Sequence, residues 1–167
     1  MTQVYIALGA NLSIPKETFS LAAHSLGEAG IRVEAVSGLW QSPAWPAGSG
    51  QPDYINACAK LSYAGSALDL LALLQGIEAQ YGRVRGARNA ARTLDLDILD
   101  FGGEVVNMPN LELPHPRMLT RGFVLFPLAE IAPDWSDPVS AIAISDWIAR
   151  LPLADVAPMS CLGAWHL

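Results

Sequence analysis

One stretch of alternating residues constrains this chain more than any other: Arg92-Thr-Leu-Asp-Leu-Asp-Ile-Leu99. Alternation of apolar and polar residues with period 2 predicts a β-strand. Its aliphatic residues would face a core, and Asp95 and Asp97 would lie side by side on the opposite face. Two residues along a strand span about 6.6 Å, which lets two carboxylates bind one or two divalent cations. The pair therefore indicates a metal site.

The loop that leads into this strand is rich in arginine. Residues 82–92 read Gly-Arg-Val-Arg-Gly-Ala-Arg-Asn-Ala-Ala-Arg, and six of the ten basic residues lie between Arg83 and Arg121. Guanidinium groups bind phosphate oxygens in a bidentate manner, which favours arginine over lysine at such sites. Carboxylates for a metal beside fixed positive charges indicate a polyphosphate substrate. We expect the loop to close over a triphosphate, since no Gly-Lys-Ser/Thr motif is present to bind one.

Composition limits the classes of function. The 167 residues are 51% hydrophobic and 16% charged, with a net charge of −6. This predicts one domain, residues 1–167, with a substantial core, and it argues against binding to nucleic acid. We expect no membrane span and no secretory leader. Cys58 and Cys161 are too few and too far apart for a disulfide framework, and Cys58 reads as a buried thiol. These features favour a reducing, cytoplasmic setting. We also expect a monomer, although none of these features determines the oligomeric state.

The order of predicted elements indicates the fold class. Strands are expected at 3–9, 31–41, 54–63 and 92–99, and helices at about 15–27 and 67–81. Residues 107–123 read mostly as loop after a hairpin signal at 101–104, and helices are expected at 123–131 and 139–151. The first six elements follow the βαββαβ order of ferredoxin-like folds. We predict an α+β fold with that core, an added C-terminal hairpin and helices, and α/β/α layers.

Several further side chains are candidates for a binding site. Tyr54 and Asn56 share one face of a predicted strand, and an aromatic ring beside a carboxamide suits a flat heterocycle. His115 lies between two prolines in a stiff loop. Gln75 and Glu78 lie one helical turn apart. Taken alone, Tyr54 is better explained as a packed side chain, and Gln75 and Glu78 as part of a solvated helix face. His115 alone is equally compatible with a structural and a binding role.

Two other functions fit part of this pattern. An RNA-binding module is compatible with a ferredoxin-like sheet but needs aromatic residues with basic flanks, and the acidic balance argues against it. A two-metal phosphohydrolase shares the paired aspartates and the arginines, but it does not account for the set Tyr54, Asn56 and Phe123. Cleavage of a metal-bound nucleoside triphosphate with and without a heterocyclic acceptor would separate hydrolysis from transfer.

Taken together, the segments resemble the 6-hydroxymethyl-7,8-dihydropterin pyrophosphokinase family of folate biosynthesis, over about residues 3–133. The motifs that carry the resemblance are Ala7-Leu-Gly-Ala-Asn-Leu12, Ser42-Pro43, Gln51-Pro-Asp-Tyr-Ile-Asn-Ala57, Gly82-Arg-Val-Arg85, Arg92-Thr-Leu-Asp-Leu-Asp-Ile98, Leu113-Pro-His115 and Arg121-Gly-Phe123. The resemblance implies transfer of pyrophosphate from ATP to the pterin hydroxymethyl group, with release of AMP.

The resemblance also implies a role for each matching residue. Asp95 and Asp97 would bind two Mg²⁺ ions that bridge the triphosphate, and Arg83 and Arg92 would act on the phosphates in the transition state. ATP would be bound by Gln75, Glu78, Arg85, Arg88, Arg92, Ile98, His115 and Arg121. The pterin would be bound by Gly9, Ser42, Pro43, Trp45, Tyr54, Asn56 and Phe123, with its ring between Tyr54 and Phe123.

The chain departs from the family in the arginine-rich loop. Many members have Arg-Trp-Gly-Pro-Arg where this chain has Arg88-Asn-Ala-Ala-Arg92. Asn89 thus replaces an aromatic ring that can cover the pterin when the loop closes.

Overall fold

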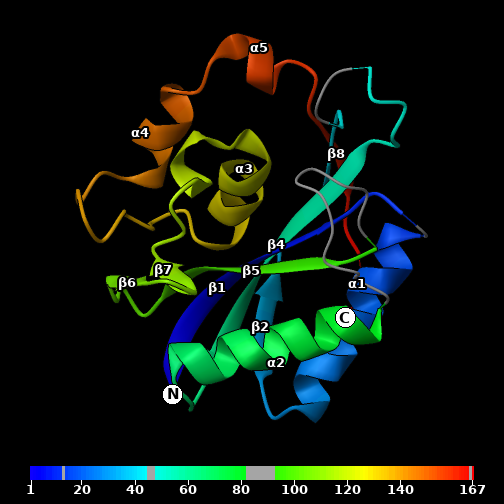
Figure 1. Ribbon diagram of the computed structural model, residues 1–167. Helices are drawn as coiled ribbons and strands as arrows, with labels where there is room; N and C mark the ends of the chain where they lie inside the picture. Colours follow the sequence, from blue (N-terminus) through cyan, green and yellow to red (C-terminus); the bar gives the residue numbers. More distant parts are fainter. Residues whose placement is uncertain (13, 45–47, 82–92, 166) are drawn as a thin grey trace.

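A six-stranded antiparallel sheet forms the centre of the molecule in the computed structural model, which describes residues 1–12, 14–44, 48–81, 93–165 and 167 (Figure 1). The strand order is β5-β1-β4-β3-β8, and β2 also pairs with β4. The strands are β1 (Thr2–Ala10), β2 (Arg32–Val36), β3 (Leu39–Ser42), β4 (Tyr54–Tyr63), β5 (Asp95–Phe101) and β8 (Ser160–Gly163). The predicted combination of helices with a sheet is therefore confirmed, and the sheet is antiparallel.

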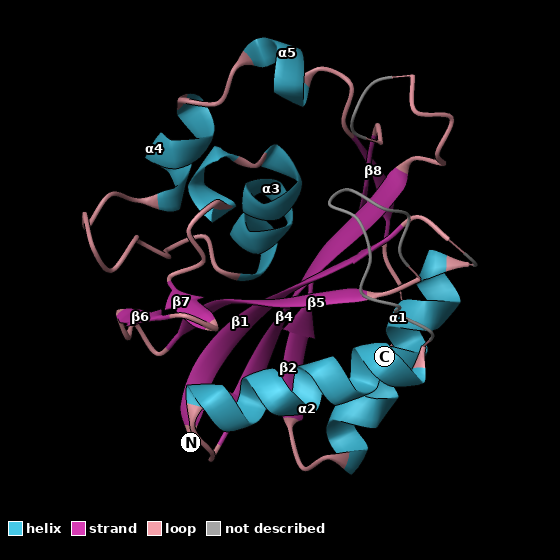
Figure 2. Ribbon diagram, viewed as in Figure 1, coloured by secondary structure: helices cyan, strands magenta, loops and turns pink. Residues whose placement is uncertain are grey.

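Helices lie on both faces of this sheet (Figure 2). They are α1 (Pro15–Glu28), α2 (Ala67–Gln80), α3 (Gly122–Ile131), α4 (Ile144–Ala149) and α5 (Leu153–Val156), with a short 3-10 helix at Met118–Thr120. A separate hairpin pairs β6 (Val106–Met108) with β7 (Leu111–Leu113). None of the helices in the described part of the chain combines the length and the hydrophobicity needed to cross a membrane.

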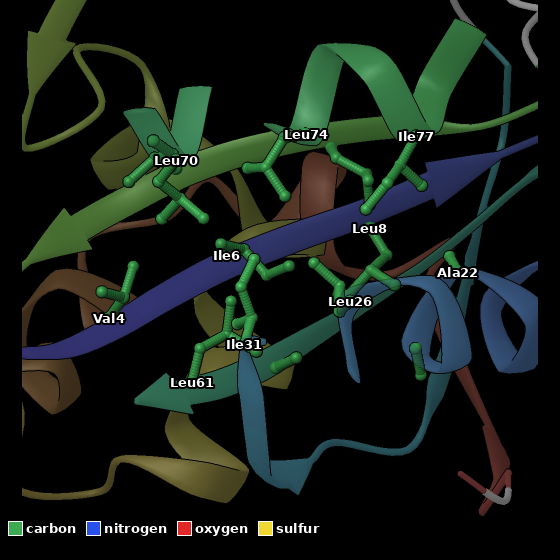
Figure 3. Close-up of a cluster of buried hydrophobic side chains, with 14 of the residues drawn as sticks. Val4, Ile6, Leu8, Ala22, Leu26, Ile31, Leu61, Leu70, Leu74 and Ile77 are labelled. Carbon is green, nitrogen blue, oxygen red and sulfur yellow. The ribbon is translucent and has the colours of Figure 1, made fainter. Parts of the chain in front are cut away.

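Each face of the sheet has its own hydrophobic core. Val4, Ile6 and Leu8 of β1 pack with buried residues of α1 and α2 on one face (Figure 3). Tyr5 of β1 and Cys58 of β4 lie in the second core, together with α3 and its neighbours. This division follows from the period-2 alternation of side chains along a strand. The same alternation determines which face the polar residues of β5 occupy.

Local sequence signals account for the two helices under the first core. Pro15 occupies the first turn of α1, where its missing N–H costs nothing. Ser66 caps α2: its side chain accepts a hydrogen bond from the Asp69 backbone N–H, and the Asp69 side chain accepts one from the Ser66 backbone. This reciprocal capping box satisfies two of the donors that a helix start leaves open. Both helices, and the cap at Ser66, agree with the sequence-based prediction.

The prediction of one strand over 31–41 is wrong, because the chain breaks into β2 and β3 at Ser37 and Gly38. The Ser37 N–H donates to the carbonyl of Cys58, and the Cys58 N–H donates back to the Ser37 hydroxyl, at 2.9 Å each. The Gly38 N–H donates to Oε2 of Glu130 at 2.8 Å. Side-chain partners therefore replace the regular ladder at the break, and these partners lie far away in sequence.

Two C-terminal predictions also need correction. The segment 107–123 is not mostly loop, because it contains β7 and the 3-10 helix as well as most of β6. The helix expected over 139–151 is confined to Ile144–Ala149. Upstream of it the Asp137 carboxylate accepts hydrogen bonds from the backbone of Val139 and Ser140, and Ala141 has a φ of 59°. This turn competes with helix at those residues.

The last residues of the chain complete the first core. Trp165 is 4% exposed, its indole N–H donates to the Ser37 carbonyl at 2.8 Å, and its ring meets Phe19 edge-on at a centroid distance of 5.8 Å. The strand β8 before it extends the sheet beyond β3. Neither feature is apparent from the sequence. An isolated tryptophan and a strand of only four residues are too short to show the periodic pattern from which strands and helices are predicted.

Trp165→Ala should therefore lower the free energy of unfolding by about 3–5 kcal/mol, since it empties a core position and leaves the Ser37 carbonyl without this donor. Leu162→Ala, at a residue that is 53% exposed, is the matched control and should change it by less than about 0.5 kcal/mol. Urea unfolding of the two variants measures the difference. Equal stabilities would show that the C-terminal residues do not belong to the core.

Candidate active site

Three residues from adjacent strands form a row across one end of the sheet. In the strand register Gly9 of β1 is the partner of Asp95 on β5 and of Asn56 on β4. Directly paired residues on neighbouring strands have side chains on the same face. The row therefore brings a carboxylate from one edge of the sheet within two strand spacings of a carboxamide.

Asp95 and Asp97 point away from the first core. Leu94, Leu96 and Ile98 are buried at 4% exposure or less, whereas the two aspartates between them are only partly buried. The predicted orientation of the β5 side chains is thus confirmed. One oxygen of Asp95, Oδ1, is shielded from solvent. The pair forms a carboxylate surface that is half sheltered by the protein.

Gly9 keeps the centre of this row open. A Cβ atom built on Gly9 would lie 3.0 Å from Oδ1 of Asn56 and 4.0 Å from Cβ of Asp95. A contact of 3.0 Å is too short for an ordinary Cβ, so any larger residue would displace the Asn56 carboxamide. Asn56 is itself 8% exposed and its Nδ2 donates to the Ser42 hydroxyl at 3.4 Å. The carboxamide is therefore held by a hydrogen bond to β3 on one side, and on the other side it fits because Gly9 has no side chain.

The start of β4 adds an aromatic ring beside this row. Tyr54 is partly buried and pairs in register with Ser42 of β3, which is 7% exposed. Asn11 follows β1, and its Nδ2 donates to Gln51 Oε1 and to the Pro52 carbonyl, at 3.2 Å each. Asn11 thus positions the segment that enters β4. Sequence reasoning assigned Asn11 no role, although a polar residue at the end of a buried strand was available as a signal.

The structure says little about the remaining candidates for pterin and phosphate binding. Pro43, the residue after β3, is exposed. Trp45 lies outside the described residues, as do Arg83, Arg85, Arg88, Asn89 and Arg92 of the arginine-rich loop. The predictions made for those residues stay predictions.

The first residues of α3 carry the second predicted aromatic ring. Phe123 is partly buried against the second core, and the Arg121 guanidinium lies over its ring at 5.4 Å from the centroid. A cation at this distance is attracted by the face of the ring. Arg121 also caps the start of α3, where its carbonyl accepts hydrogen bonds from the N–H groups of Val124 and Leu125. The helix start therefore presents one cation and one ring together.

His115 is attached to β5 by its backbone. Its N–H donates to the carbonyl of Leu99 at 2.9 Å, at the point where the register between β1 and β5 shifts by one residue. A bulge of this kind leaves a residue outside the regular ladder, and here that residue is Leu99. The irregularity in β5 thus supplies the acceptor that holds His115 near the aspartates.

The environment of His115 keeps its imidazole neutral. Burial, reinforced by the guanidinium groups of Arg121 and Arg117, lowers the pKa of His115 to about 4, and the opposing effect of Asp95 is smaller. Its Nδ1 accepts a hydrogen bond from the Arg117 backbone N–H at 3.2 Å. The proton of the neutral ring therefore belongs on Nε2, which can donate to an anionic ligand.

The two helical candidates for ATP binding differ in exposure. Gln75 is exposed, whereas Glu78 is 3% exposed and its Oε1 accepts a hydrogen bond from the Leu96 backbone N–H at 2.7 Å. Since β5 is an edge strand, its outward N–H groups need partners from outside the sheet. Glu78 provides one, between the two aspartates. Ile98 has its side chain in the first core, so any contact with ATP would use its main chain.

Asp95 and Asp97 are the residues suited to a divalent cation. Within residues 1–12, 14–44, 48–81, 93–165 and 167, no group of three or more His, Cys, Asp and Glu side chains is arranged to hold a metal. Mg²⁺ commonly uses one or two carboxylates and completes its octahedron with water and substrate phosphates. A pair of half-sheltered carboxylates fits this ion and not one that needs a closed protein cage.

Comparisons with known sequences point to one family. The sequence model described as 7,8-dihydro-6-hydroxymethylpterin-pyrophosphokinase (HPPK) matches residues 5–133. A 2-amino-4-hydroxy-6-hydroxymethyldihydropteridine pyrophosphokinase of Synechocystis sp. is 40% identical over 156 residues, which cover 93% of this chain and 79% of that protein. The protein of the same name from Pseudomonas aeruginosa is 46% identical over 134 residues, 79% of this chain and 82% of the relative.

Solved structures share the fold. The crystal structure of Plasmodium falciparum HPPK-DHPS with pteroate superimposes with a TM-score of 0.69 at 12% identity, over 89% of this chain and 42% of that one. The chain spans less than half of that larger protein, and at this identity the likeness concerns the fold alone. The sequence match includes the strands that carry Gly9, Asn56 and Asp95, so the chain belongs to the 7,8-dihydro-6-hydroxymethylpterin-pyrophosphokinase family.

Proposed function

We propose that the row Asp95, Gly9 and Asn56 is the centre of the active site in which this chain works as a pyrophosphokinase. The chain transfers the pyrophosphoryl group of ATP to the hydroxymethyl group of 6-hydroxymethyl-7,8-dihydropterin, a reaction of folate biosynthesis that releases AMP. One observation carries the assignment of the site: Gly9 pairs with a carboxylate on one side and a carboxamide on the other. The phosphates of ATP, bound on the carboxylate side, and the pterin, bound on the carboxamide side, can therefore meet above Gly9, which has no side chain.

Asp95 and Asp97 would hold two Mg²⁺ ions on the triphosphate. These ions would neutralise the charge that develops on the phosphate oxygens and stabilise both the attacking and the leaving oxygen. The half-buried position of the aspartates supports this role, because water is partly excluded there and charge interactions are stronger. As a hypothesis, Asp97 also assists removal of the proton from the hydroxymethyl group.

Recognition of the pterin would combine stacking with hydrogen bonds to its edge. Tyr54 and Phe123 would enclose the ring, and the Asn56 carboxamide would bind its polar edge with a donor and an acceptor. Ser42, Pro43 and the chain up to Trp45 would complete the edge contacts. The buried Asn56 amide, oriented by Ser42, supports this assignment.

The triphosphate would be held by neutral and cationic donors around the aspartates. His115 would donate from Nε2, and Arg121 would contribute a fixed positive charge. Arg83, Arg85, Arg88 and Arg92 would bind the phosphates, with Arg83 and Arg92 acting in the transition state. The remaining ATP contacts would come from Gln75, Glu78 and the main chain of Ile98. Catalysis of phosphoryl transfer depends mainly on positioning and charge neutralisation, for which this set of residues is suited.

The organisation of the molecule follows the same proposal. Strand order β5-β1-β4-β3, with α1 and α2 on one face, supports the ferredoxin-like βαββαβ core. The β6–β7 hairpin and the helices α3 to α5 would be additions to it. We further propose that residues 1–167 act as one domain and as a monomer in the cytoplasm, where the free cysteines Cys58 and Cys161 stay reduced.

Asp95→Asn and Asp97→Asn should each lower kcat by at least about a hundredfold, because each removes an anionic ligand of the metal that stabilises the transition state. AMP formation from Mg-ATP, with and without the hydroxymethyl dihydropterin, is the measurement. Asp134→Asn, at an exposed aspartate outside the row, is the control and should keep full turnover. Release of AMP or ADP at the same rate without pterin would identify a hydrolase. Full turnover by Asp97→Asn would exclude Asp97 as the proton acceptor.

Gly9→Ala should weaken pterin binding about tenfold or more, because the added methyl group would push the Asn56 carboxamide from its position. Affinity for Mg-ATP should stay within a factor of about two, because the contact on the Asp95 side is an ordinary van der Waals distance. Titration calorimetry with each ligand separates the two effects. An unchanged pterin affinity would remove Asn56 from the binding site.

Lowering the pH in the absence of divalent cations should destabilise the protein through His115. Its pKa is about 4 when folded and near 6.5 when unfolded, so the unfolded chain binds the proton first as the pH falls. This loss of stability begins below about pH 6.5 and is complete near pH 4. The melting temperature of His115→Gln should therefore fall less than that of the parent over this range. An NMR titration of His115 with a midpoint near 6.5 would contradict the assignment.

A further inference from the structure

Gly122 is the second point at which the site depends on a missing side chain. A Cβ atom built on Gly122 would lie 2.8 Å from Sδ of Met159 and 3.5 Å from Cδ1 of Leu151. Gly122 is buried within α3 and its φ is not in the left-handed region. Space and not backbone conformation therefore distinguishes glycine here, because a Cβ atom would displace the flexible end of the Met159 side chain. The side chain of Met159 packs directly on the backbone between Arg121 and Phe123.

Met159 also joins this helix start to the opposite wall of the proposed pterin pocket. The next two residues, Ser160 and Cys161, pair in register with Gln41 and Trp40 of β3. The strand β3 ends at Ser42, and Ser42 pairs with Tyr54. A continuous run of contacts therefore leads from Phe123 through Gly122 and Met159 to β3 and on to Tyr54.

The other end of α3 is held to the same strand by different residues. The ring of Trp40 lies 5.2 Å from that of Phe126, and its indole N–H donates to Oε1 of Glu130. The other oxygen of Glu130 accepts from the Gly38 N–H at 2.8 Å. These contacts fix the body of α3 on β3. In the first turn Val124 and Leu125 are buried in the second core, and the Met159 side chain lies against the turn at Gly122.

We infer that Met159 is a positioning residue that sets the distance between Phe123 and Tyr54 and thereby the affinity for the pterin. The inference rests on the proposed function, in which these two rings enclose the heterocycle. Met159 lies beyond residues 5–133, the stretch that the family's sequence model matches. It acts through the backbone of Gly122, which is bonded to Arg121 on one side and to Phe123 on the other, whereas Asp95, Asp97 and His115 lie on other elements. Its effect should therefore be larger for the pterin than for Mg-ATP.

The test is a double-mutant cycle on the contact between Met159 and Gly122. Gly122→Ala and Met159→Ala should each raise the pterin Kd and KM by about three- to tenfold, the first by overpacking and the second by leaving a gap. The Kd for Mg-ATP should change less than the pterin Kd, because Arg121 is one of several proposed phosphate contacts, and kcat should change by less than about twofold. In the double variant the new methyl group occupies part of the vacated space, so the pterin Kd should return toward that of the parent.

Controls separate positioning from general damage. Met159→Leu conserves volume and should restore the parental pterin Kd. Leu153→Ala alters an 80% exposed residue of the same C-terminal region and should leave all constants unchanged. If Met159→Ala does not fold, Gly122→Ala carries the test, because alanine is a better helix former than glycine and perturbs the same contact from the other side.

Phe123→Ala distinguishes the inference from the proposed function. If Phe123→Ala weakens pterin binding but the single changes at Gly122 and Met159 do not, the inference is wrong and the site assignment stands. If Phe123→Ala has no effect, the assignment of the pterin site itself fails. Additive effects of Gly122→Ala and Met159→Ala, or parallel losses for Mg-ATP and pterin, would also overturn the positioning role.

Discussion

The register of β1 between β4 and β5 is the constraint on which the site depends. It places Gly9 opposite Asn56 and Asp95 at once, and it leaves Ala7 between Cys58 and Asp97 one step further along the strand. A shift by one residue would turn the aspartates toward α2 and the leucines toward the ligands. The first core opposes such a shift, because Ile6 and Leu8 of β1 are completely or almost completely buried under α1 and α2. Hydrophobic packing on one face of the sheet thus determines the chemistry available on the other.

Small residues at two points make room for this chemistry. Gly9 opens the sheet where carboxylate and carboxamide approach, and Gly122 lets the C-terminal segment pack against the start of α3. In both places the backbone conformation is accessible to other residues, so the constraint is steric. Rigid supports surround these openings: Glu78 holds the edge of β5, and Leu99 holds His115. The groups proposed to bind ligand are therefore positioned by hydrogen bonds from neighbouring elements.

Sequence reasoning was most successful where the signal is local or periodic. Alternation along β5 predicted the orientation of Asp95 and Asp97, and the cap at Ser66 predicted the start of α2. It failed where distant residues decide the structure. The break at Gly38 depends on Glu130, and β8 depends on an open edge of β3, which no short window of sequence contains. From the sequence, Glu78 looked like part of a solvated helix face. Its hydrogen-bond donor, the Leu96 N–H, belongs to β5 and cannot be recognised from the sequence of the helix.

Paramagnetic broadening of the Asn56 side chain tests the central claim most directly. Mn²⁺ with a non-hydrolysable ATP analogue would replace the magnesium complex, and amide spectra of the labelled protein would report proximity to the ion. The account predicts strong broadening of the Asn56 side-chain amide and of the backbone amides of Asp95 and Asp97. Thr2, at the far end of β1 and about 23 Å away along the strand, should be little affected. Broadening centred near Thr2, or none at Asn56, would contradict the account.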